Sequence, residues 1–337
     1  MRNKLIKNLL QKYISQNNTF QLIDIGSMDG PEKEWKDIED HIKIVGFEPD
    51  EREFKKLIND RIHTYFNTIL WSQSKEINFS ITREPGKSSV MHPNIDLLKL
   101  FPNSERFEVI KTVKFKESQV QTLDALFLNN HLGDIDFLKL DAQGSELEIL
   151  KGSHFIIDNL LLGLKVEVEF IELYKNQPLF CGVDSYLKEH GFQLMDLKRY
   201  FWKRNNYQNF MGKGQLVFGE ALYFKDIDIF FNVLTHNKFS SPQDKIIKFT
   251  TLCLIYGLHD YAVLILTKAL NHSLLEKDIY NNILETILKY DKKYNHIAFP
   301  GSSKIVGLLQ RLIFKLQKNK PSWSEADHFL GNRSNWR

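Results

Sequence analysis

FQLIDIGSMDG, at residues 20–30, is an apolar run closed by a glycine-rich turn. Short apolar runs that end in this way are typical of strands buried in a parallel sheet. Gly26 allows the chain to turn sharply, and Gly30 allows the backbone that follows to come close to a ligand. Such a turn can also simply join two elements tightly, so the site prediction needs a second signal.

That second signal is Glu48, which closes the next apolar run, IKIVGF at residues 42–47. The charged residues 31–40 between the two runs are long enough for a helix, which gives a right-handed strand–helix–strand unit. Glu48 lies 24 residues after Asp24, and an acid at about this separation commonly accepts hydrogen bonds from ribose hydroxyls. Glu48 alone could equally be a solvated carboxylate. The turn and the acid together predict a nucleoside-cofactor site.

The spacing of the glycines indicates which nucleoside. The turn reads Gly-x-x-x-Gly and lacks the Gly-x-Gly-x-x-Gly pattern of dinucleotide binders, so a pyrophosphate cradle is not indicated. A smaller ligand with one ribose and an amino-acid tail fits better. S-adenosylmethionine has this composition.

The remaining apolar runs extend the sheet to about residue 225. We expect further strands at residues 62–70, 77–81, 109–115, 135–140, 161–170, 192–197 and 215–224, the last two as an antiparallel pair. Residues 82–106 are polar and contain three prolines, which favours a long loop over an edge of the sheet. Helical patterns lie between the later strands. This alternation predicts a doubly wound α/β fold.

Three regions follow from these patterns. Residues 1–19 form an N-terminal helix, residues 20–225 form the α/β domain, and residues 226–337 form an all-α appendix with a loosely ordered tail from residue 317. A helical repeat is not indicated, because no second copy appears at a fixed period.

Composition and charge exclude several classes of protein. The chain has 337 residues, 42% of them hydrophobic, and a net charge of only +3, which is too weak a signal to suggest DNA binding. The two cysteines could form one disulfide at most, and two reduced thiols explain them equally well, so they do not distinguish between classes. No window predicts a transmembrane segment, and the N-terminal stretch does not resemble a secretory signal. We therefore expect a cytoplasmic protein.

The run DFLKLDAQGSELEILKG, at residues 136–152, resembles the hallmark of the FkbM family of S-adenosylmethionine-dependent methyltransferases. Residues 24–30 and 47–49 resemble the cofactor motifs of that family, and residues 67–72 resemble its third-strand segment. Further pieces keep the order of the family: residues 122–124, 166–170, Tyr174, 177–180 and 191–192. The resemblance covers residues 20–224.

The resemblance implies a class I methyltransferase (Rossmann-like) fold: a seven-stranded sheet whose last strand is antiparallel, with the cofactor across the carboxyl ends of the first strands. It also implies an O-methyltransferase acting on a hydroxyl of a sugar, a surface glycan or a related metabolite, in glycan biosynthesis. The expected cofactor-binding residues are Asp24, Gly26, Ser27, Gly30, Glu48, Asn67, Thr68, Ser72, Ser89 and Asp141.

Carboxylates at strand ends are the candidates for accepting the proton of a poorly nucleophilic hydroxyl. They are Asp141, Glu167 and Glu169, of which the last two share one face of their strand. The three together could also hold a divalent ion. Alternatively, the glutamates are polar residues at a wet strand end or partners of Lys165. His92, in the loop at residues 86–94, is a further candidate base; no histidine has zinc-ligand spacing with cysteine.

Candidate substrate-binding residues are Gln143, Tyr174, Arg199 and Trp202. Gln143 stands where the family commonly has glutamate, so its amide can bind but cannot accept a proton. Arg199 and Trp202 belong to the basic-aromatic run at residues 198–204, which suits an acidic glycan but also single-stranded RNA or a plain exposed hairpin.

Two other functions therefore stay open. The first is RNA 2′-O-methylation. The second is a non-catalytic scaffold of a glycan-assembly complex, in which residues 226–316 dock a partner or a second copy of the chain.

Overall fold

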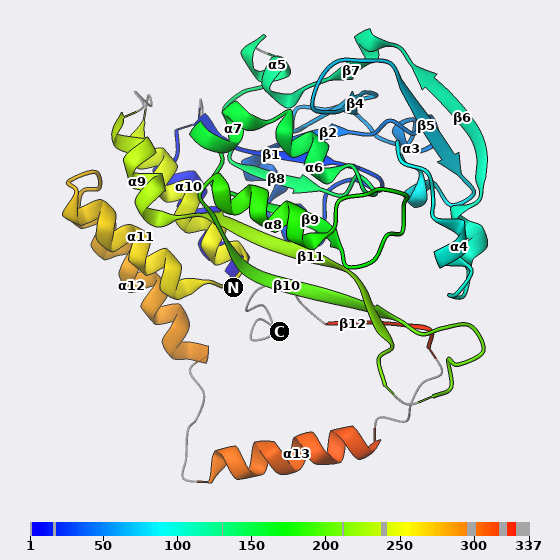
Figure 1. The fold of residues 1–337 in the computed structure, drawn as a ribbon. Helices are drawn as coiled ribbons and strands as arrows, with labels where there is room; N and C mark the ends of the chain where they lie inside the picture. Colours follow the sequence, from blue (N-terminus) through cyan, green and yellow to red (C-terminus); the bar gives the residue numbers. More distant parts are fainter. Residues whose placement is uncertain are drawn as a thin grey trace.

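A computed structural model describes residues 2–15, 18–129, 131–210, 212–236, 241–294, 301–316 and 322–327 of the chain (Figure 1). Its centre is an eight-stranded sheet with the order β12-β10-β11-β9-β8-β1-β2-β3. The strand bounds are β1 Phe20–Ile25, β2 Ile42–Phe47, β3 His63–Phe66, β8 Phe137–Leu140, β9 Gly163–Glu169, β10 Phe192–Trp202, β11 Gln215–Lys225 and β12 Ser324–Ala326.

Seven of these strands confirm the predicted fold. β1 pairs in parallel with β2 and β8, and β8 pairs in parallel with β9, while β11 runs antiparallel to both β9 and β10. The chain thus starts at the centre of the sheet, moves to one edge, returns and builds the other half. This is a doubly wound sheet with an antiparallel last strand, as the class I methyltransferase resemblance implies.

The eighth strand corrects the expected strand count and lies in the tail from residue 317 that was expected to be loosely ordered, of which the structure describes residues 322–327. β12 pairs antiparallel with residues Tyr200–Trp202 at the edge of β10. Trp323, just before β12, lies 5.5 Å from the Trp202 ring, and the Arg106 guanidinium lies 4.8 Å from the Trp323 ring. These aromatic contacts hold the short strand, which has too few residues to show alternation in the sequence.

The predicted third strand, residues 62–70, is two separate strands. Only β3 joins the central sheet; β4 (Ile69–Leu70) instead pairs with β7 (Val120–Gln121). The predicted strands at 77–81 and 109–115 are β5 (Ile77–Thr82) and β6 (Val109–Phe115), which form their own antiparallel pair. The expected loop between them contains three short helical turns: η3 Pro85–Lys87, α4 Ile95–Leu98 and η4 Ser104–Phe107.

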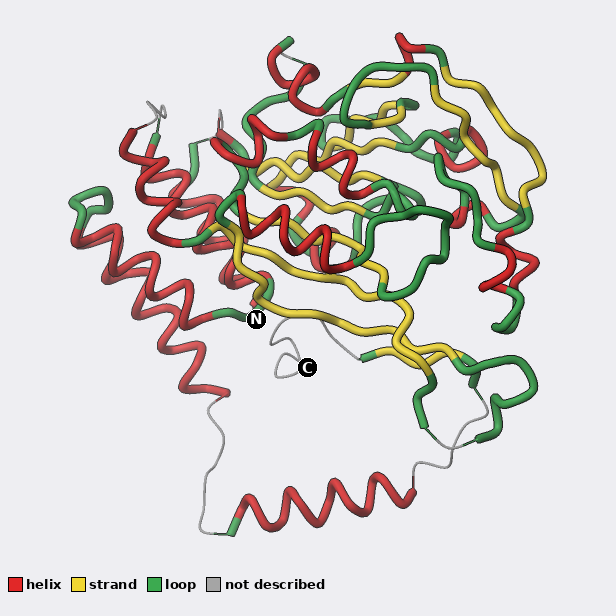
Figure 2. Tube along the Cα trace, viewed as in Figure 1, coloured by secondary structure: helices red, strands yellow, loops and turns green. Residues whose placement is uncertain are grey.

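Alternate strand residues supply the two cores of the sheet. Ile23 and Val45 face a core shared with the helices α5 to α8, whereas Leu22 and Ile44 face a core shared with α1 and α9 to α12. Figure 2 shows helices on both faces of the sheet. The helix bounds are α1 Arg2–Tyr13, α2 Lys33–Lys36, α3 Glu51–Phe54, α5 Leu123–Leu128, α6 Glu146–Lys151, α7 His154–Asn159, α8 Phe180–Glu189, α9 Ile227–His236, α10 Pro242–Ile255, α11 His259–Asn271, α12 Lys277–Tyr294 and α13 Ser302–Leu316.

The C-terminal helices are attached to the sheet by charge as well as by apolar packing. Asp136, directly before β8, is fully buried and accepts hydrogen bonds from Lys245 Nζ and Lys248 Nζ of α10, each at 2.8 Å. The backbone N–H of Gln21 in β1 donates to the same carboxylate at 2.9 Å. The predicted α/β domain and the first helices of the predicted appendix therefore share one interior.

Helix α13 carries several exposed apolar side chains, which include Ile305, Leu308 and Leu309. None of the helices in the described part of the chain has the length and apolar character needed to cross a membrane.

Candidate active site

A cavity lies at the carboxyl ends of the parallel strands, where the sequence predicts the site. It encloses about 980 Å³ of empty space, some of which is open to solvent. Six of the predicted site residues line it: Gly26, Glu48, Thr68, Asp141, Gln143 and Glu167. Apolar residues including Phe47 and Leu70 form other parts of the wall, and the segment at residues 84–88 lines a further part.

Position 26 requires a glycine because the ends of β1 and β8 approach each other closely there. It has φ +78°, and a Cβ atom built on it would lie 1.9 Å from the backbone oxygen of Asp141. Its N–H donates to the Phe47 oxygen at 3.0 Å, so the ends of β1, β2 and β8 converge on this residue. No side chain fits here, which leaves the cavity floor as bare backbone.

Comparing Gly26→Ala with Gly30→Ala tests this geometry. Gly30 also has positive φ, +73°, but its nearest neighbour to a Cβ is the Tyr65 hydroxyl at 3.7 Å. We expect Gly30→Ala to cost only the left-handed strain of about 1–2 kcal/mol. Gly26→Ala must in addition displace the Asp141 backbone and should cost at least about 1 kcal/mol more. Urea unfolding measures both; equal costs would contradict the close approach.

Asp24 and Ser27 lie beneath this turn and hold it in place. Asp24 is buried against Lys139 Nζ at 3.0 Å, and the same ammonium donates to the Gly26 oxygen at 2.8 Å. Ser27 Oγ donates to the Asp24 oxygen at 2.6 Å. Burial raises the pKa of Asp24, although the nearby Lys139 opposes the shift. Neither residue lines the cavity, so both act on it through the backbone.

Glu48 presents a buried carboxylate at the end of β2. One of its oxygens accepts a hydrogen bond from the Asp50 N–H at 2.8 Å, and burial raises its pKa to about 7. The Asn67 amide donates to the backbone oxygens of Glu48 and Pro49, which fixes the turn. A carboxylate so held can accept hydrogen bonds from vicinal hydroxyls, provided that it is ionised.

The segment over the cavity is tied down at three points. Ser88 Oγ donates to Asp50 at 3.0 Å, and Ser89 Oγ donates to the Gln143 backbone oxygen at 2.7 Å. Tyr174 Oη has one proton for two acceptors, the Lys87 backbone oxygen at 2.9 Å and Gln143 Oε1 at 3.0 Å.

Two other predicted residues lie outside the cavity wall. Ser72 donates to Glu148 of α6, and the exposed His92 accepts the Lys175 N–H through its backbone oxygen.

Gln143 is the centre of the polar network. Its Nε2 donates to Asp141 at 2.7 Å and to Glu167 at 2.9 Å, while its Oε1 accepts the Tyr174 hydroxyl at 3.0 Å. Lys87 Nζ also reaches this oxygen, at 3.4 Å. Gln143 has φ +53°, a conformation that is costly for a residue other than glycine and is concentrated at functional sites. The amide thus joins two of the carboxylates that line the cavity, Asp141 and Glu167.

The buried carboxylates differ in protonation. Burial favours the neutral form of Asp141, but the charges of Lys139 and Lys87 and the Gln143 hydrogen bond outweigh it, so its pKa is lowered. Burial and the neighbouring negative charges raise the pKa values of Glu167 and Glu169 well above the usual value of a glutamate. Asp141 is therefore the ionised member of the group.

Glu146 is a member of this cluster that the sequence analysis missed. Oxygens of Glu146, Glu167 and Glu169 lie within 4.8 Å of one another, and Glu146 also accepts the Ala142 N–H at 2.8 Å. The residue stands inside the family-like run, but its position on a helix gave no sign that it faces two strand residues. The predicted alternative partner, Lys165, instead pairs with Glu32 and Glu220.

The two predicted substrate residues on β10 do not line the cavity. Trp202 is buried in an apolar cluster with Phe101 and Phe107, and Arg199 pairs with Asp327 at 2.8 Å beside β12. Tyr174 belongs to the same cluster and reaches the site through its hydroxyl alone.

Comparison with known proteins identifies one family. The methyltransferase FkbM domain matches residues 24–194. No curated protein matches the chain. Similar solved structures include a precorrin-6y C5,15-methyltransferase from Geobacter metallireducens GS-15 (12% identity, 66% of this chain and 88% of that chain, TM-score 0.33). An FkbM methyltransferase from Methylobacillus flagellatus KT has 12% identity, with coverage of 64% and 47% and a TM-score of 0.32. A putative S-adenosylmethionine-dependent methyltransferase from Listeria monocytogenes has 10% identity, with coverage of 67% and 98% and a TM-score of 0.31.

Proposed function

Because this chain belongs to the FkbM methyltransferase family, we propose that it transfers a methyl group from S-adenosylmethionine to a hydroxyl oxygen of a sugar, a surface glycan or a related metabolite. One observation carries the proposal beyond the family: a single cavity joins the glycine turn and Glu48 to the ionised Asp141. We further propose that the enzyme acts in the cytoplasm, in glycan biosynthesis.

The residues present fit S-adenosylmethionine. Gly26 contributes backbone to the cavity wall and lets the ends of β1 and β8 approach closely there, and the Glu48 carboxylate can accept the two ribose hydroxyls. Phe47 and Leu70 provide apolar surface for the adenine ring, and Thr68 adds a hydroxyl. When bound, the cofactor supplies a methyl group on a positively charged sulfur.

The chain's own groups then have distinct tasks. Asp141 accepts the proton of the acceptor hydroxyl, because it is the ionised one of the two carboxylates that Gln143 joins. Gln143 orients Asp141 and Glu167 by donating to both. The segment at residues 84–88 excludes water and, with Gln143, positions the acceptor over the reacting end of the cavity. We also propose that Asp141, Glu167 and Glu169 can hold a divalent ion at this reacting end of the cavity.

Cofactor affinity is expected to depend on pH through Glu48. The ionised form accepts the ribose hydroxyls, and its pKa is about 7, so lowering the pH from 8 to 6 should weaken S-adenosylmethionine binding about tenfold. Glu48→Ala should weaken binding at pH 8 by about 1–3 kcal/mol and remove this pH dependence. Isothermal titration calorimetry at several pH values measures both effects.

The control is Glu51→Gln, an exposed carboxylate of the same turn that pairs with Lys55. It should keep the affinity and the pH dependence of the parent chain. No binding heat from folded protein would count against the whole proposal, whereas an unchanged affinity in Glu48→Ala would refute only the ribose role.

The RNA alternative loses support from the charges of β10. Lys198 pairs with Glu220, Arg199 pairs with Asp327, and Lys203 Nζ donates to two backbone oxygens of the hairpin. This basic-aromatic run therefore presents less free charge to phosphates than its sequence suggests. Incubation with labelled cofactor and separate glycan and RNA fractions, followed by identification of the labelled product, distinguishes the two acceptors.

A docking role of the helical region is compatible with catalysis. The exposed apolar side chains of α13 support the proposal that this region binds a second copy of the chain or a glycan-assembly partner.

A further inference from the structure

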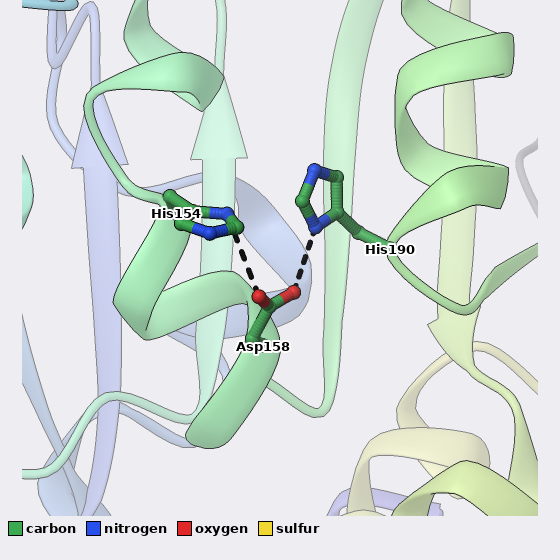
Figure 3. Close-up of side chains that lie close together, drawn as sticks. All are labelled: His154, Asp158 and His190. Atoms are coloured by element: carbon green, nitrogen blue, oxygen red, sulfur yellow. Dashed lines mark hydrogen bonds and ion pairs between the residues drawn. The ribbon is translucent and has the colours of Figure 1, made fainter.

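A second group of metal-ligating side chains joins two helices outside the cavity. His154 and Asp158 lie one turn apart on α7, and His190 follows the end of α8. His154 Nδ1 lies 3.4 Å from one Asp158 oxygen, and His190 Nδ1 lies 2.7 Å from the other. Figure 3 shows the two rings on either side of the carboxylate, with Nδ1 of His190 pointing at it.

The position of this group separates it from the proposed active site. Asp158 precedes β9, which begins at Gly163, and His190 precedes β10, which begins at Phe192. Both strands run in the same direction, because β11 is antiparallel to each. The group therefore lies at the edge where the strands begin, and the cavity lies at the edge where they end.

The distances suit a small transition-metal ion. Ligands about 2.0–2.1 Å from a tetrahedral zinc ion lie roughly 3.3 Å from one another. One candidate ligand atom from each residue lies within 4.8 Å of those of the other two. The two histidine nitrogens lie 3.4 and 2.7 Å from different oxygens of Asp158. Two imidazoles and one carboxylate favour zinc over magnesium or calcium, which prefer oxygen ligands alone.

The surrounding structure fixes two of the ligands and leaves one adjustable. Lys225 Nζ donates to the backbone oxygens of both Ile157 and His190, at 2.9 and 3.0 Å, so it holds the two ligand-bearing segments together. The His190 side chain is only 16% exposed and packs on the Tyr186 ring. His154 is 62% exposed and can rotate to complete the site.

We propose that His154, Asp158 and His190 bind one zinc ion, with water at the open fourth position. Each Nδ1 can either donate a proton to Asp158 or, once deprotonated, donate its lone pair to a metal beside that carboxylate. The ion would then link α7 to α8 at the base of the sheet. This role is independent of methyl transfer, so its test does not rest on the proposed function.

Calorimetric titration of the tag-free, metal-stripped full chain with Zn²⁺ tests the site. We expect one equivalent of zinc whose binding depends on His154 and His190, distinct from any ion in the cavity, and a melting temperature that rises with zinc concentration. His154→Ala and His190→Ala should each weaken binding at least about tenfold. Replacing zinc with Co²⁺ should give the visible absorption of a four-coordinate ion, which both variants lose.

Two controls separate this site from other metal ligands. His131→Ala removes an exposed histidine elsewhere and should leave the zinc isotherm unchanged. Glu169→Gln alters the acidic cluster of the cavity and should also leave it unchanged. Unaltered zinc affinity in both His154→Ala and His190→Ala would overturn the proposal. So would the absence of zinc heat from the folded parent chain, which would leave the group as hydrogen-bonded ion pairs.

Discussion

Asp141→Asn is expected to lower kcat/KM for methyl transfer by about two to four orders of magnitude, the usual contribution of a positioned general base. Asparagine keeps the size of the side chain and an oxygen that can accept from Gln143, but it cannot take a proton from the acceptor. The loss should fall mainly on kcat. Initial rates with labelled cofactor, together with calorimetric cofactor affinity, separate chemistry from binding.

Glu148→Gln is the matched control for Asp141→Asn. Glu148 is a carboxylate of the adjoining helix α6 that bonds to Ser72 and Lys151 and does not line the cavity. Its activity should stay within about twofold of the parent enzyme. If Asp141→Asn kept more than a tenth of the parental kcat, proton acceptance would have to be assigned to another group.

Asp136→Asn is expected to reduce the free energy of unfolding by about 3–5 kcal/mol, because it removes the charge of the carboxylate that two buried ammonium groups share. Lys245 and Lys248 are almost fully buried, and both bond to Asp136; Lys245 also lies 3.0 Å from Asp134. Urea unfolding of the full chain measures the loss. A reduction below about 1 kcal/mol would contradict the role of this ion cluster.

Two further variants test whether the buried charges cause the loss of stability in Asp136→Asn. Asp228→Asn removes an exposed partner of Lys268 and should cost less than about 1 kcal/mol. The triple replacement Asp136→Asn, Lys245→Met and Lys248→Met should recover most of the lost stability, because it removes the buried charges and keeps an oxygen at residue 136 for the Gln21 N–H.

Lowering the pH should reveal how much the ion cluster around Asp136 contributes to stability. Burial disfavours ionised Asp136, but Lys245 and Lys248 lower its pKa below the ordinary 3.8. Its contribution to stability is therefore complete above pH 3.8 and is lost as the pH falls through the lower folded value. Asp136→Asn should flatten the dependence of stability on pH in this acidic range.

The sequence predicted the parts of the fold that depend on periodicity. Apolar runs such as residues 20–25 and 42–47 identify buried strands because both of their faces are covered by helices. The split of residues 62–70 into β3 and β4 was not predictable in this way, because the choice of partner strand is made by tertiary contacts. The same holds for β12, whose three residues are held by Trp202 and Arg106.

The sequence could predict those parts of the candidate site that lie at a glycine turn or at the end of a strand. Gly26 and Glu48 stand at such points, and both line the cavity. Glu146 and Lys87 were missed because a helix and a loop bring them to the carboxylates from outside the strand pattern. Local sequence also gives no sign of the group formed by His154, Asp158 and His190, since it depends on how α7 and α8 pack.

The three ties on the segment above the cavity reach opposite ends of the site: Ser88 holds the β2 side through Asp50, and Ser89 and Tyr174 hold the β8 side. A segment bonded to both sides of the site can move away only when these hydrogen bonds break. For the proposed methyl transfer, any such movement that admits or releases a reactant would be a separate step, whose rate competes with the chemical step for control of turnover.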